Sequence, residues 1–392
     1  MTISEQFARY AELCAIAQKQ AIELENHPDM QKHLRMFSTK EVAEVLGVTD
    51  AYIRQLVRAN SDFPQGTLGG GSHRRFTIEE IHTARTWLFE KHGKMEYQPR
   101  RREREDIQVV TFVNFKGGSG KTTSAVHFAQ YLALHGYRTL LVDLDPQASA
   151  TTLHGFAPAT EVEPEQTFAA WIRQDDDDDL TTTMDRMTLR TYWPHLDLVP
   201  ATVALQQVEF EIMGNLRHDP RYPFYAQGKD FVDAVEKDYD VIVFDCRPDV
   251  GMLTINALVA ATALVIPMPP SMVDFASSGE FFRFMAEVSE QMQGVDENYM
   301  NYDFVKILTT KFKSNDKNQS EIVKWTQALF QGAVLEDAML DTVALDAAGI
   351  AMTSLYEYEP KGNRDSYTRA ITSLNAANAA ILSEVHIAWG RA

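Results

Sequence analysis

Apolar residues follow three successive patterns along the chain, and each pattern predicts a different kind of structure. At the N-terminus their spacing alternates between four and three residues. The positions are Ile3, Phe7, Tyr10, Cys14, Ala17, Ala21 and Leu24. Such a seam of heptads predicts a helix that packs against a partner, either a second subunit or the body of the same chain. We favour self-association and assign residues 1–34 to an N-terminal dimerisation helix.

The next segment predicts two short helices joined by a tight turn. Ser38 or Thr39 can cap the first helix, and Thr49 or Asp50 can cap the second. Between them, Gly47 supplies the turn. Two short amphipathic helices in this arrangement are typical of a helix–turn–helix, whose second helix enters a DNA groove.

A glycine-rich hairpin and a third helix follow. Three glycines precede Arg74 and Arg75, which predict a hairpin tip and a short strand, and a helix is expected from about Thr77 to Lys91. The arrangement resembles a winged helix of the MerR type. We therefore expect residues 35–98 to be a DNA-binding domain. Its candidate DNA contacts are Arg54, Arg58, Arg74 and Arg75.

The remainder of the chain predicts an α/β domain. Residues 99–106 begin with proline and are rich in charge, so they are interpreted as a solvated, basic linker. Beyond them, short apolar runs recur between helical segments. The runs are 107–113, 139–144, 196–200, 241–245, 263–268 and 304–310. Runs of this kind predict a mostly parallel sheet covered by helices on both faces, here over residues 107–392.

The first of these predicted strands leads into a phosphate-binding loop, KGGSGKT at 116–122, and a helix follows. Glycines let backbone N–H groups turn inward around phosphates, and the helix N-terminus adds positive potential. We expect Lys121 to bridge the β- and γ-phosphates and the Thr122 hydroxyl to ligate Mg²⁺. The sequence therefore predicts a P-loop NTPase with ATP or ADP and Mg²⁺ as cofactors. The other predicted nucleotide contacts in the loop are Gly117, Gly118, Ser119, Gly120 and Thr123.

Three carboxylates end two other predicted strands. Asp143 lies at the end of the run at 139–144, Asp145 directly follows that run, and Asp245 ends the run at 241–245. Functional groups gather at the carboxyl ends of parallel strands, so these side chains are expected near the phosphates. Together with Thr122, Asp143 and Asp245 are the predicted metal side of the site.

The loop and these carboxylates carry a resemblance. KGGSGKT, DLDPQAS and FDCRPDVG, in this order, resemble the motifs of the ParA/MinD class of deviant Walker ATPases. With the N-terminal winged helix and this length, the chain is similar to the large plasmid and phage partition ATPases. The resemblance implies that Lys116, at the first position of the loop, reaches across a dimer to the other subunit's ATP. It also implies that Asp145 orients the attacking water, so Lys116, Lys121 and Asp145 are the candidate catalytic residues.

Further roles follow only from the resemblance. Pro269, Ser271 and Asp274 match a loop near the γ-phosphate, and Thr310 with Lys311 lies where the family places adenine contacts. The family is expected to hydrolyse ATP slowly in a cycle of dimerisation and DNA binding. In this cycle a ParB-like centromere-binding partner is expected to stimulate hydrolysis and so release the protein from DNA. The winged helix is expected to bind an operator. One departure is Arg247, where the family has proline or a small residue.

Charge is distributed unevenly. The net charge of −18 argues against coating DNA with the whole surface. Residues 1–106 hold 16 basic and 16 acidic residues, and the remainder holds 21 and 39. DNA contact is therefore expected in the N-terminal part and in one basic patch near the C-terminus. The patch consists of Lys361, Arg364 and Arg369, which are candidates for sequence-independent phosphate contact.

Other features narrow the setting and the alternatives. No apolar run reaches the roughly 18 residues of a membrane span, and two distant cysteines make neither a disulfide framework nor a cysteine cluster. We expect a cytoplasmic, nucleoid-associated homodimer. One alternative stays open, a nucleotide-sensing transcriptional repressor without an ATPase cycle, although the intact Asp145, which a pure sensor could lose, counts against it. A metabolic or metal-insertion ATPase of the same fold is disfavoured, because Cys14 and Cys246 do not supply the cysteine ligands of the nitrogenase iron protein and amidoligase-type relatives lack a winged helix.

Overall fold

The structure is a computed structural model. It describes residues 34–69, 73–174, 180–360 and 364–391, together with Ile3, Gln6, Phe7, Arg9, Tyr10, Leu13, Ile16 and Lys32. No helix within these ranges has both the length and the apolar character of a membrane span. Of the heptad seam, Cys14, Ala17, Ala21 and Leu24 lie outside the described residues. Ile3, Phe7 and Tyr10 are helical and exposed, and self-association through them stays a prediction.

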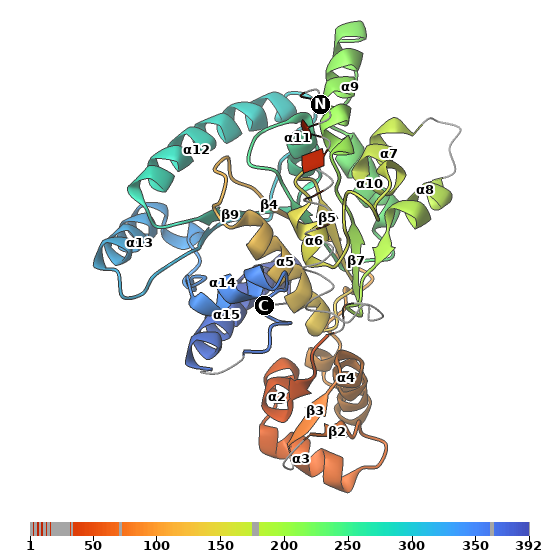
Figure 1. Cartoon of the computed structure of the whole chain (residues 1–392), viewed down its shortest axis with the longest axis vertical. Helices are drawn as coiled ribbons and strands as arrows, with labels where there is room; N and C mark the ends of the chain where they lie inside the picture. Colours follow the sequence, from red (N-terminus) through yellow and green to blue (C-terminus); the bar gives the residue numbers. More distant parts are fainter. Residues whose placement is uncertain are drawn as a thin grey trace.

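The segment from Phe37 to His92 forms three helices and a small antiparallel sheet, drawn at the bottom of Figure 1. The elements are β1 (Phe37–Ser38), α2 (Thr39–Leu46), α3 (Asp50–Ala59), β2 (Thr67–Leu68), β3 (Arg74–Phe76) and α4 (Ile78–His92), with strand order β1-β3-β2. The hydroxyls of Ser38 and Thr49 cap α2 and α3, and Gly47 turns the chain between them with a φ of 68°. The three predicted helices are confirmed, and β1 is an additional strand.

A seven-stranded sheet forms the centre of the rest of the chain. Its strands are β4 (Gln108–Phe112), β5 (Thr139–Asp143), β6 (Leu189–Arg190), β7 (Leu196–Val199), β8 (Val241–Asp245), β9 (Ala263–Met268) and β10 (Phe304–Thr309). They lie in the order β10-β9-β4-β8-β5-β7-β6, and only the edge strand β6 is antiparallel. The six predicted strands are therefore confirmed, and β6 is an additional strand that no apolar run predicted.

Helices cover both faces of this sheet, as the predicted α/β fold requires (Figure 1). One face carries α5 (Lys121–Leu134), α14 (Val343–Ile350) and α15 (Asp365–Ala388). The other carries α7 (Phe168–Arg173), α9 (Ala204–His218), α10 (Gln227–Val235), α11 (Met252–Ala260) and α12 (Met272–Gln293). The short α6 (Ser149–Leu153), α8 (Leu180–Met187) and α13 (Lys317–Phe330) complete the shell. Alternate residues of β4 supply the two cores, Val110 on one face and Val109 on the other.

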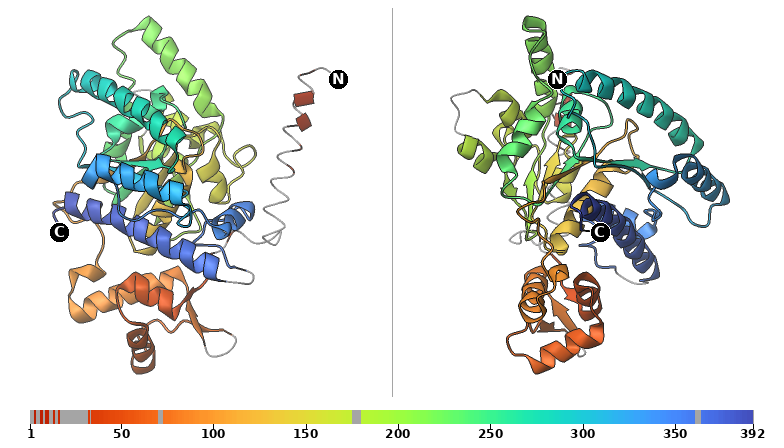
Figure 2. Two further views of the ribbon diagram at one scale, coloured as in Figure 1. Left: turned by 90° about the vertical axis from the view of Figure 1, so that its left-hand side faces the viewer. Right: turned by 180° about the vertical axis from the view of Figure 1, so that it is seen from behind.

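The N-terminal helices pack directly against this body. His82 of α4 makes a 2.9 Å hydrogen bond through Nε2 with the carbonyl of Ala133, near the end of α5. Its ring stacks on His195 with centroids 4.2 Å apart. Burial, and then the neighbouring His195, lower the pKa of His82 to about 3, so this contact is made by a neutral ring. In Figure 2, α15 crosses the body just above these helices.

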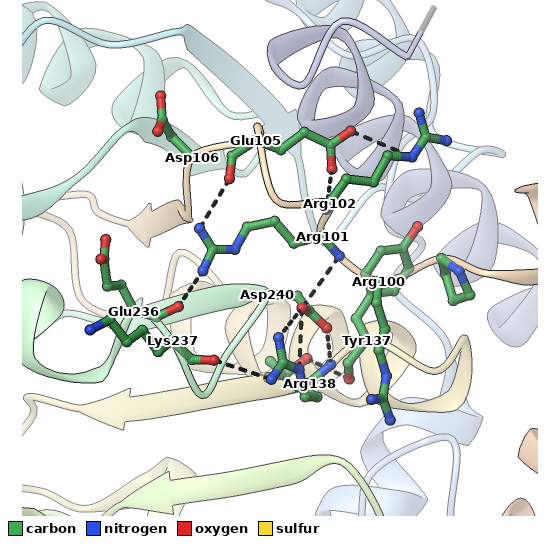
Figure 3. A network of polar contacts seen from close by, with 12 residues as sticks. Arg100, Arg101, Arg102, Glu105, Asp106, Tyr137, Arg138, Glu236, Lys237 and Asp240 are labelled. Atoms are coloured by element: carbon green, nitrogen blue, oxygen red, sulfur yellow. Dashed lines mark hydrogen bonds and ion pairs between the residues drawn. The ribbon is translucent and has the colours of Figure 1, made fainter.

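The charged segment 99–106 is partly buried. Figure 3 shows Arg101 donating to the carbonyl of Glu105 at 3.0 Å and, through its backbone, to Asp240 at 3.3 Å. Arg138 also pairs with Asp240, at 2.7 Å. The Glu105 carboxylate, 7% exposed, pairs at 2.6 Å with Arg391 near the C-terminus. The interpretation of residues 99–106 as a solvated linker is therefore wrong for Arg101 and Glu105. Their partners include residues that are far away in the sequence.

The buried pair of Glu105 and Arg391 generates a stability prediction. Arg391→Ala should lower the free energy of unfolding by about 3 kcal/mol, because it leaves a carboxylate buried without its cation. Urea denaturation would measure the change. Arg102→Ala is the matched control. Its guanidinium lies 3.8 Å from the same carboxylate but is 45% exposed, so its loss should cost less than about 1 kcal/mol. Equal losses of unfolding free energy in the two variants would contradict the prediction that the buried pair of Glu105 and Arg391 stabilises the fold.

Candidate nucleotide-binding site

The phosphate-binding loop joins the end of β4 to the start of α5, as predicted. Gly118 and Gly120 have φ angles of 73° and 94°, a region that favours glycine. Lys121 begins α5, is buried, and donates from Nζ to the carbonyl of Lys116 at 3.0 Å. Burial lowers the pKa of Lys121, while the nearby carboxylate of Asp245 opposes that shift. The loop is thus closed around its own lysine at the N-terminus of a helix, where anions bind.

Thr310 supports the loop from the end of β10. Its hydroxyl donates to the carbonyl of Ser119 at 2.7 Å. A Cβ added to Gly120 would lie 3.4 Å from that of Thr310, so the two segments are in contact. The ammonium of Lys311 lies 4.0 Å from where a Cβ of Gly118 would be. The structure therefore places both residues beside the loop, and their contact with adenine stays a prediction.

Asp143 and Asp245 lie opposite each other on the paired strands β5 and β8. Asp143 accepts hydrogen bonds from the backbone and hydroxyl of Thr151, at 3.0 and 2.8 Å, and from the backbone of Asp145, at 3.1 Å. The two oxygens of Asp245 are buried and make no hydrogen bond of normal geometry with described residues. The Thr122 hydroxyl is near enough to favour the charged form of Asp245.

Because Asp143 and Asp245 are buried close together, ionisation of their carboxyl groups is energetically unfavourable. Burial and the neighbouring Asp145 raise the pKa of Asp143 to about 7, against the hydrogen bonds that lower it. Burial, followed by the charge of Asp143, raises the pKa of Asp245 well above its ordinary value. A cation placed beside Asp245 would stabilise both ionised carboxylates. Asp245 has unused lone pairs for that role, whereas those of Asp143 are largely committed to its own chain.

Asp145 lies in the turn that follows β5, partly exposed. Its side chain accepts from the backbone of Gln147 at 2.9 Å, and its carbonyl accepts from the backbone of Ala148 at 2.8 Å. Asp145 is also close enough to Lys121 to influence its pKa. The turn therefore fixes the carboxylate near Lys121, and its role in orienting water stays a prediction.

Lys116 is held by α12. Its ammonium pairs with Asp274 at 2.7 Å, and Ser271 caps the same helix by accepting from the Asp274 backbone at 3.2 Å. Phe115, where the common P-loop has glycine, packs edge-on against Phe281 of α12 with ring centroids 4.8 Å apart. The structure thus places Asp274 against Lys116. Pro269, half-buried, accepts from the Ser271 backbone in the turn before α12.

Arg247 points toward other carboxylates and does not pair with Asp245. Its guanidinium lies 2.7 Å from Asp249 and 3.9 Å from Glu209 of α9. Glu209 accepts from the backbone N–H groups of Met252 and Leu253 at 2.7 and 3.1 Å, and so caps α11. The bulk and charge of Arg247 are thus accommodated between the loop after β8 and α9.

An apolar pocket adjoins the phosphate-binding loop at Gly120 and Thr123. Thr310 and Lys311, the two predicted adenine contacts, line it as well, and the other lining residues come mostly from the C-terminal part of the chain, where no sequence motif predicts a pocket. The apolar lining residues are Met339, Leu340, Leu345, Leu355, Ala370 and Leu374. Its position next to the phosphate site and its apolar lining suit a nucleotide base.

The predicted DNA contacts occupy three places. Arg54 and Arg58 are exposed on α3, and Arg54 pairs with Asp50 of the same helix. Arg74 donates to the carbonyl of Gln65 in the hairpin, and Arg75 pairs with Glu359 of the body at 2.9 Å. Arg364 and Arg369 are exposed at the start of α15, and Lys361 lies outside the described residues. An exposed side chain that sequence reasoning overlooked, Gln55, lies between Arg54 and Arg58 on the outer face of α3.

Known proteins resemble this chain over most of its length. Residues 107–298 match the family model described as an AAA domain. The putative replication protein A of Sinorhizobium fredii (strain NBRC 101917 / NGR234) is 38% identical over 93% of this chain and 89% of its own. Protein SopA of Escherichia coli (strain K12) is 31% identical over 85% and 83%.

Solved structures share the fold. A structure described as a partition protein superposes with a TM-score of 0.65 at 18% identity, covering 98% of this chain and 99% of its own. A cobyrinic acid a,c-diamide synthase from Mycobacterium smegmatis, solved with an ATP analogue and magnesium, gives 0.54 at 22% identity, over 73% and 97%. The alignment with the replication protein covers 93% of this chain, so it takes in N-terminal helices as well as the P-loop body. The chain therefore belongs to the large plasmid and phage partition ATPases of the ParA/MinD deviant-Walker class.

Proposed function

We propose that the chain is a partition ATPase that hydrolyses ATP in a Mg²⁺-dependent, slow cycle. The observation that carries the proposal is the buried carboxylate of Asp245, which lies near Thr122 and Lys121 and whose oxygens make no hydrogen bond of normal geometry with the described residues. A P-loop lysine and hydroxyl next to a carboxylate with unused lone pairs suit a metal–triphosphate complex. The M. smegmatis neighbour was solved with an ATP analogue and magnesium, which supports the same ligands here.

The residues present fit Mg²⁺. Thr122 would hold the ion directly and Asp245 through water, with phosphate oxygens completing the shell, since Mg²⁺ prefers oxygen ligands and keeps several waters. When bound, the ion neutralises phosphate charge. Gly120 and Lys121 bind phosphate, and the apolar pocket takes the base.

Asp145 is proposed to orient the attacking water. It stands on the open side of the loop and is fixed by the turn after β5, so it can hold a water in line with the γ-phosphate. Lys116 is proposed to complete the site of a second subunit. To do so it must leave Asp274, with which its ammonium pairs at 2.7 Å while 35% of the lysine side chain stays exposed to solvent.

The proposed cycle links ATP to DNA. ATP drives dimerisation and sequence-independent binding through the patch at the start of α15, and hydrolysis stimulated by a ParB-like partner releases both. The helices α2 and α3 with the β2–β3 hairpin bind an operator, which makes the protein nucleoid-associated and autoregulatory. The 31% identity to SopA over most of the chain supports this assignment. The alternative is a repressor that only senses nucleotide, and turnover distinguishes the two.

Removal of the water-orienting carboxylate should separate binding from turnover. Asp145→Ala should reduce ATP hydrolysis by about 100-fold while changing the dissociation constant for ATP less than about twofold. Radiolabelled phosphate release and equilibrium binding would measure the two quantities. Lys121→Ala is the contrasting variant, because it should lose nucleotide binding itself. If Asp145→Ala loses affinity as steeply as turnover, Asp145 is a binding residue.

Mixing two inactive variants tests whether Lys116 acts in the opposite subunit. Lys116→Ala and Asp145→Ala chains should each be nearly inactive alone. In a mixed dimer, the Asp145→Ala chain donates its Lys116 to the site that keeps Asp145. An equimolar mixture should recover about a quarter of the natural rate, since half of the dimers are mixed and each has one complete site. No recovery, with mixed dimers demonstrated by native mass spectrometry, would place Lys116 in its own subunit's site.

The two arginine groups should differ in how they bind DNA. Arg54→Ala and Arg58→Ala should each weaken operator binding by about 1–3 kcal/mol and relax its specificity. Arg364→Ala and Arg369→Ala should weaken binding to all duplexes alike and reduce the salt slope by about one unit per lost phosphate contact. Fluorescence anisotropy on operator and random duplexes across salt would show both effects. The same behaviour from both groups would refute the division.

A further inference from the structure

One turn of the body touches both the nucleotide site and the helix–turn–helix. It is the turn from Ser354 to Glu359, between α14 and α15. The side chain of Leu355 lines the apolar pocket beside Gly120 and Thr123. Its backbone N–H donates to Nε2 of His127 on α5 at 2.9 Å. The Nδ1 of the same ring must then carry the proton, and it donates to the carbonyl of Thr123 at 2.6 Å.

The same turn is fixed by a buried carboxylate. Glu357 accepts from the backbone of Ser354 at 2.8 Å and from the indole of Trp193 at 2.9 Å, and it pairs with Lys32 at 3.3 Å. Burial opposes ionisation of Glu357, but Lys32 and these donors hold its pKa below the ordinary value. A charged and fully bonded anchor of this kind makes the turn move as a unit.

Arg35 connects this turn to the first helix of the helix–turn–helix. Its Nε donates to the carbonyl of Tyr356 at 2.6 Å, and its Nη2 donates to Tyr367 of α15 at 3.1 Å and to Glu41 of α2 at 2.6 Å. Glu41 also accepts from the backbone of Ser38 and so closes the capping box of α2. The guanidinium is 10% exposed, so these bonds are made away from water, where they are strongest.

A second, weaker contact runs in parallel. Glu359, at the end of the turn, pairs at 2.9 Å with Arg75 of the β2–β3 hairpin. Both side chains are more than 40% exposed, so the pair alone contributes little. It does, however, occupy one of the arginines proposed to contact the operator.

We propose that Arg35 is a positioning residue that couples occupancy of the apolar pocket to the placement of α2 and α3 on DNA. The inference rests on the proposed nucleotide and operator binding and assigns a regulatory connection between them. A base that enters the pocket contacts Leu355, which lines it, and in this proposal shifts that residue and its turn, because close-packed interiors transmit strain. The displacement passes to the carbonyl of Tyr356, which is one residue away, and through Arg35 to Glu41. Two packed arrangements of the turn then correspond to two positions of the helix–turn–helix.

Amide hydrogen exchange on the full-length chain tests the coupling without knowledge of the operator. In the natural chain, ADP with Mg²⁺ should change protection at α5, at residues 353–360 and at α2. In Arg35→Ala, the change at α5 and at 353–360 should persist while the change at α2 disappears. Arg35→Lys keeps a charge for Glu41 but cannot reach all three acceptors, and should behave in the same way. Arg54→Ala is the matched control, since Arg54 lies on α3 outside this connection and should leave the response of α2 intact.

A second readout uses operator affinity. In the natural chain, ADP should change the affinity for the operator by about fivefold, which is the low end of measured allosteric couplings. In Arg35→Ala, ADP should leave the operator affinity unchanged. An α2 response or an affinity ratio that survives in both Arg35 variants would overturn the proposal. So would a natural chain in which ADP protects α5 but leaves α2 unchanged. If ADP does not protect α5 at all, the proposed nucleotide binding fails, and the coupling fails with it.

Discussion

Helix α5 is buried on every side, and the rest of the structure depends on that burial. Its N-terminus holds the phosphate-binding loop, its flank packs on β5 and β8, and its other flank is covered by α15. Its last turn accepts α4 through the carbonyl of Ala133. A helix without a solvated face has no amphipathic stripe, so it is stable only when all of these partners are assembled. Nucleotide site and N-terminal helices are consequently supported by one element.

Electrostatics impose a second constraint at the end of that helix. Asp143 and Asp245 are buried opposite each other, and their raised pKa values show that the folded chain holds two carboxylates at a cost. Thr151 offsets part of the cost for Asp143 with two hydrogen bonds. For Asp245 the offset comes from the nearby Thr122 hydroxyl and the charge of Lys121. A cation beside the two carboxylates would lower the cost of their charge further, as proposed for Mg²⁺.

The sequence predicted what depends on local pattern. Apolar runs revealed six of the seven strands of the large sheet, because a parallel strand covered on both faces is apolar throughout. Caps and turn residues located α2 and α3 because Ser38, Thr49 and Gly47 act on their own neighbours. The motif residues around Lys121 and Asp245 were found for the same reason. Contacts between distant segments were not found. The pairing of Lys116 with Asp274, the bond from Thr310 to Ser119 and the burial of Glu105 by Arg391 depend on tertiary packing, which one-dimensional periodicity does not record.

Contacts with α12 explain two departures from the common P-loop, Phe115 and Lys116. Phe115 replaces a glycine, and its ring is taken up by the aromatic face of α12. The same helix presents Asp274 to Lys116. A single helix therefore both anchors the first part of the loop and holds its free lysine. Phe115 packs on the fully buried Phe281, whereas the Lys116 side chain is 35% exposed, so the lysine can exchange partners while the loop stays in place. In the proposed dimer, a second subunit's phosphates, which carry more negative charge than one carboxylate, would be the stronger partner for that ammonium.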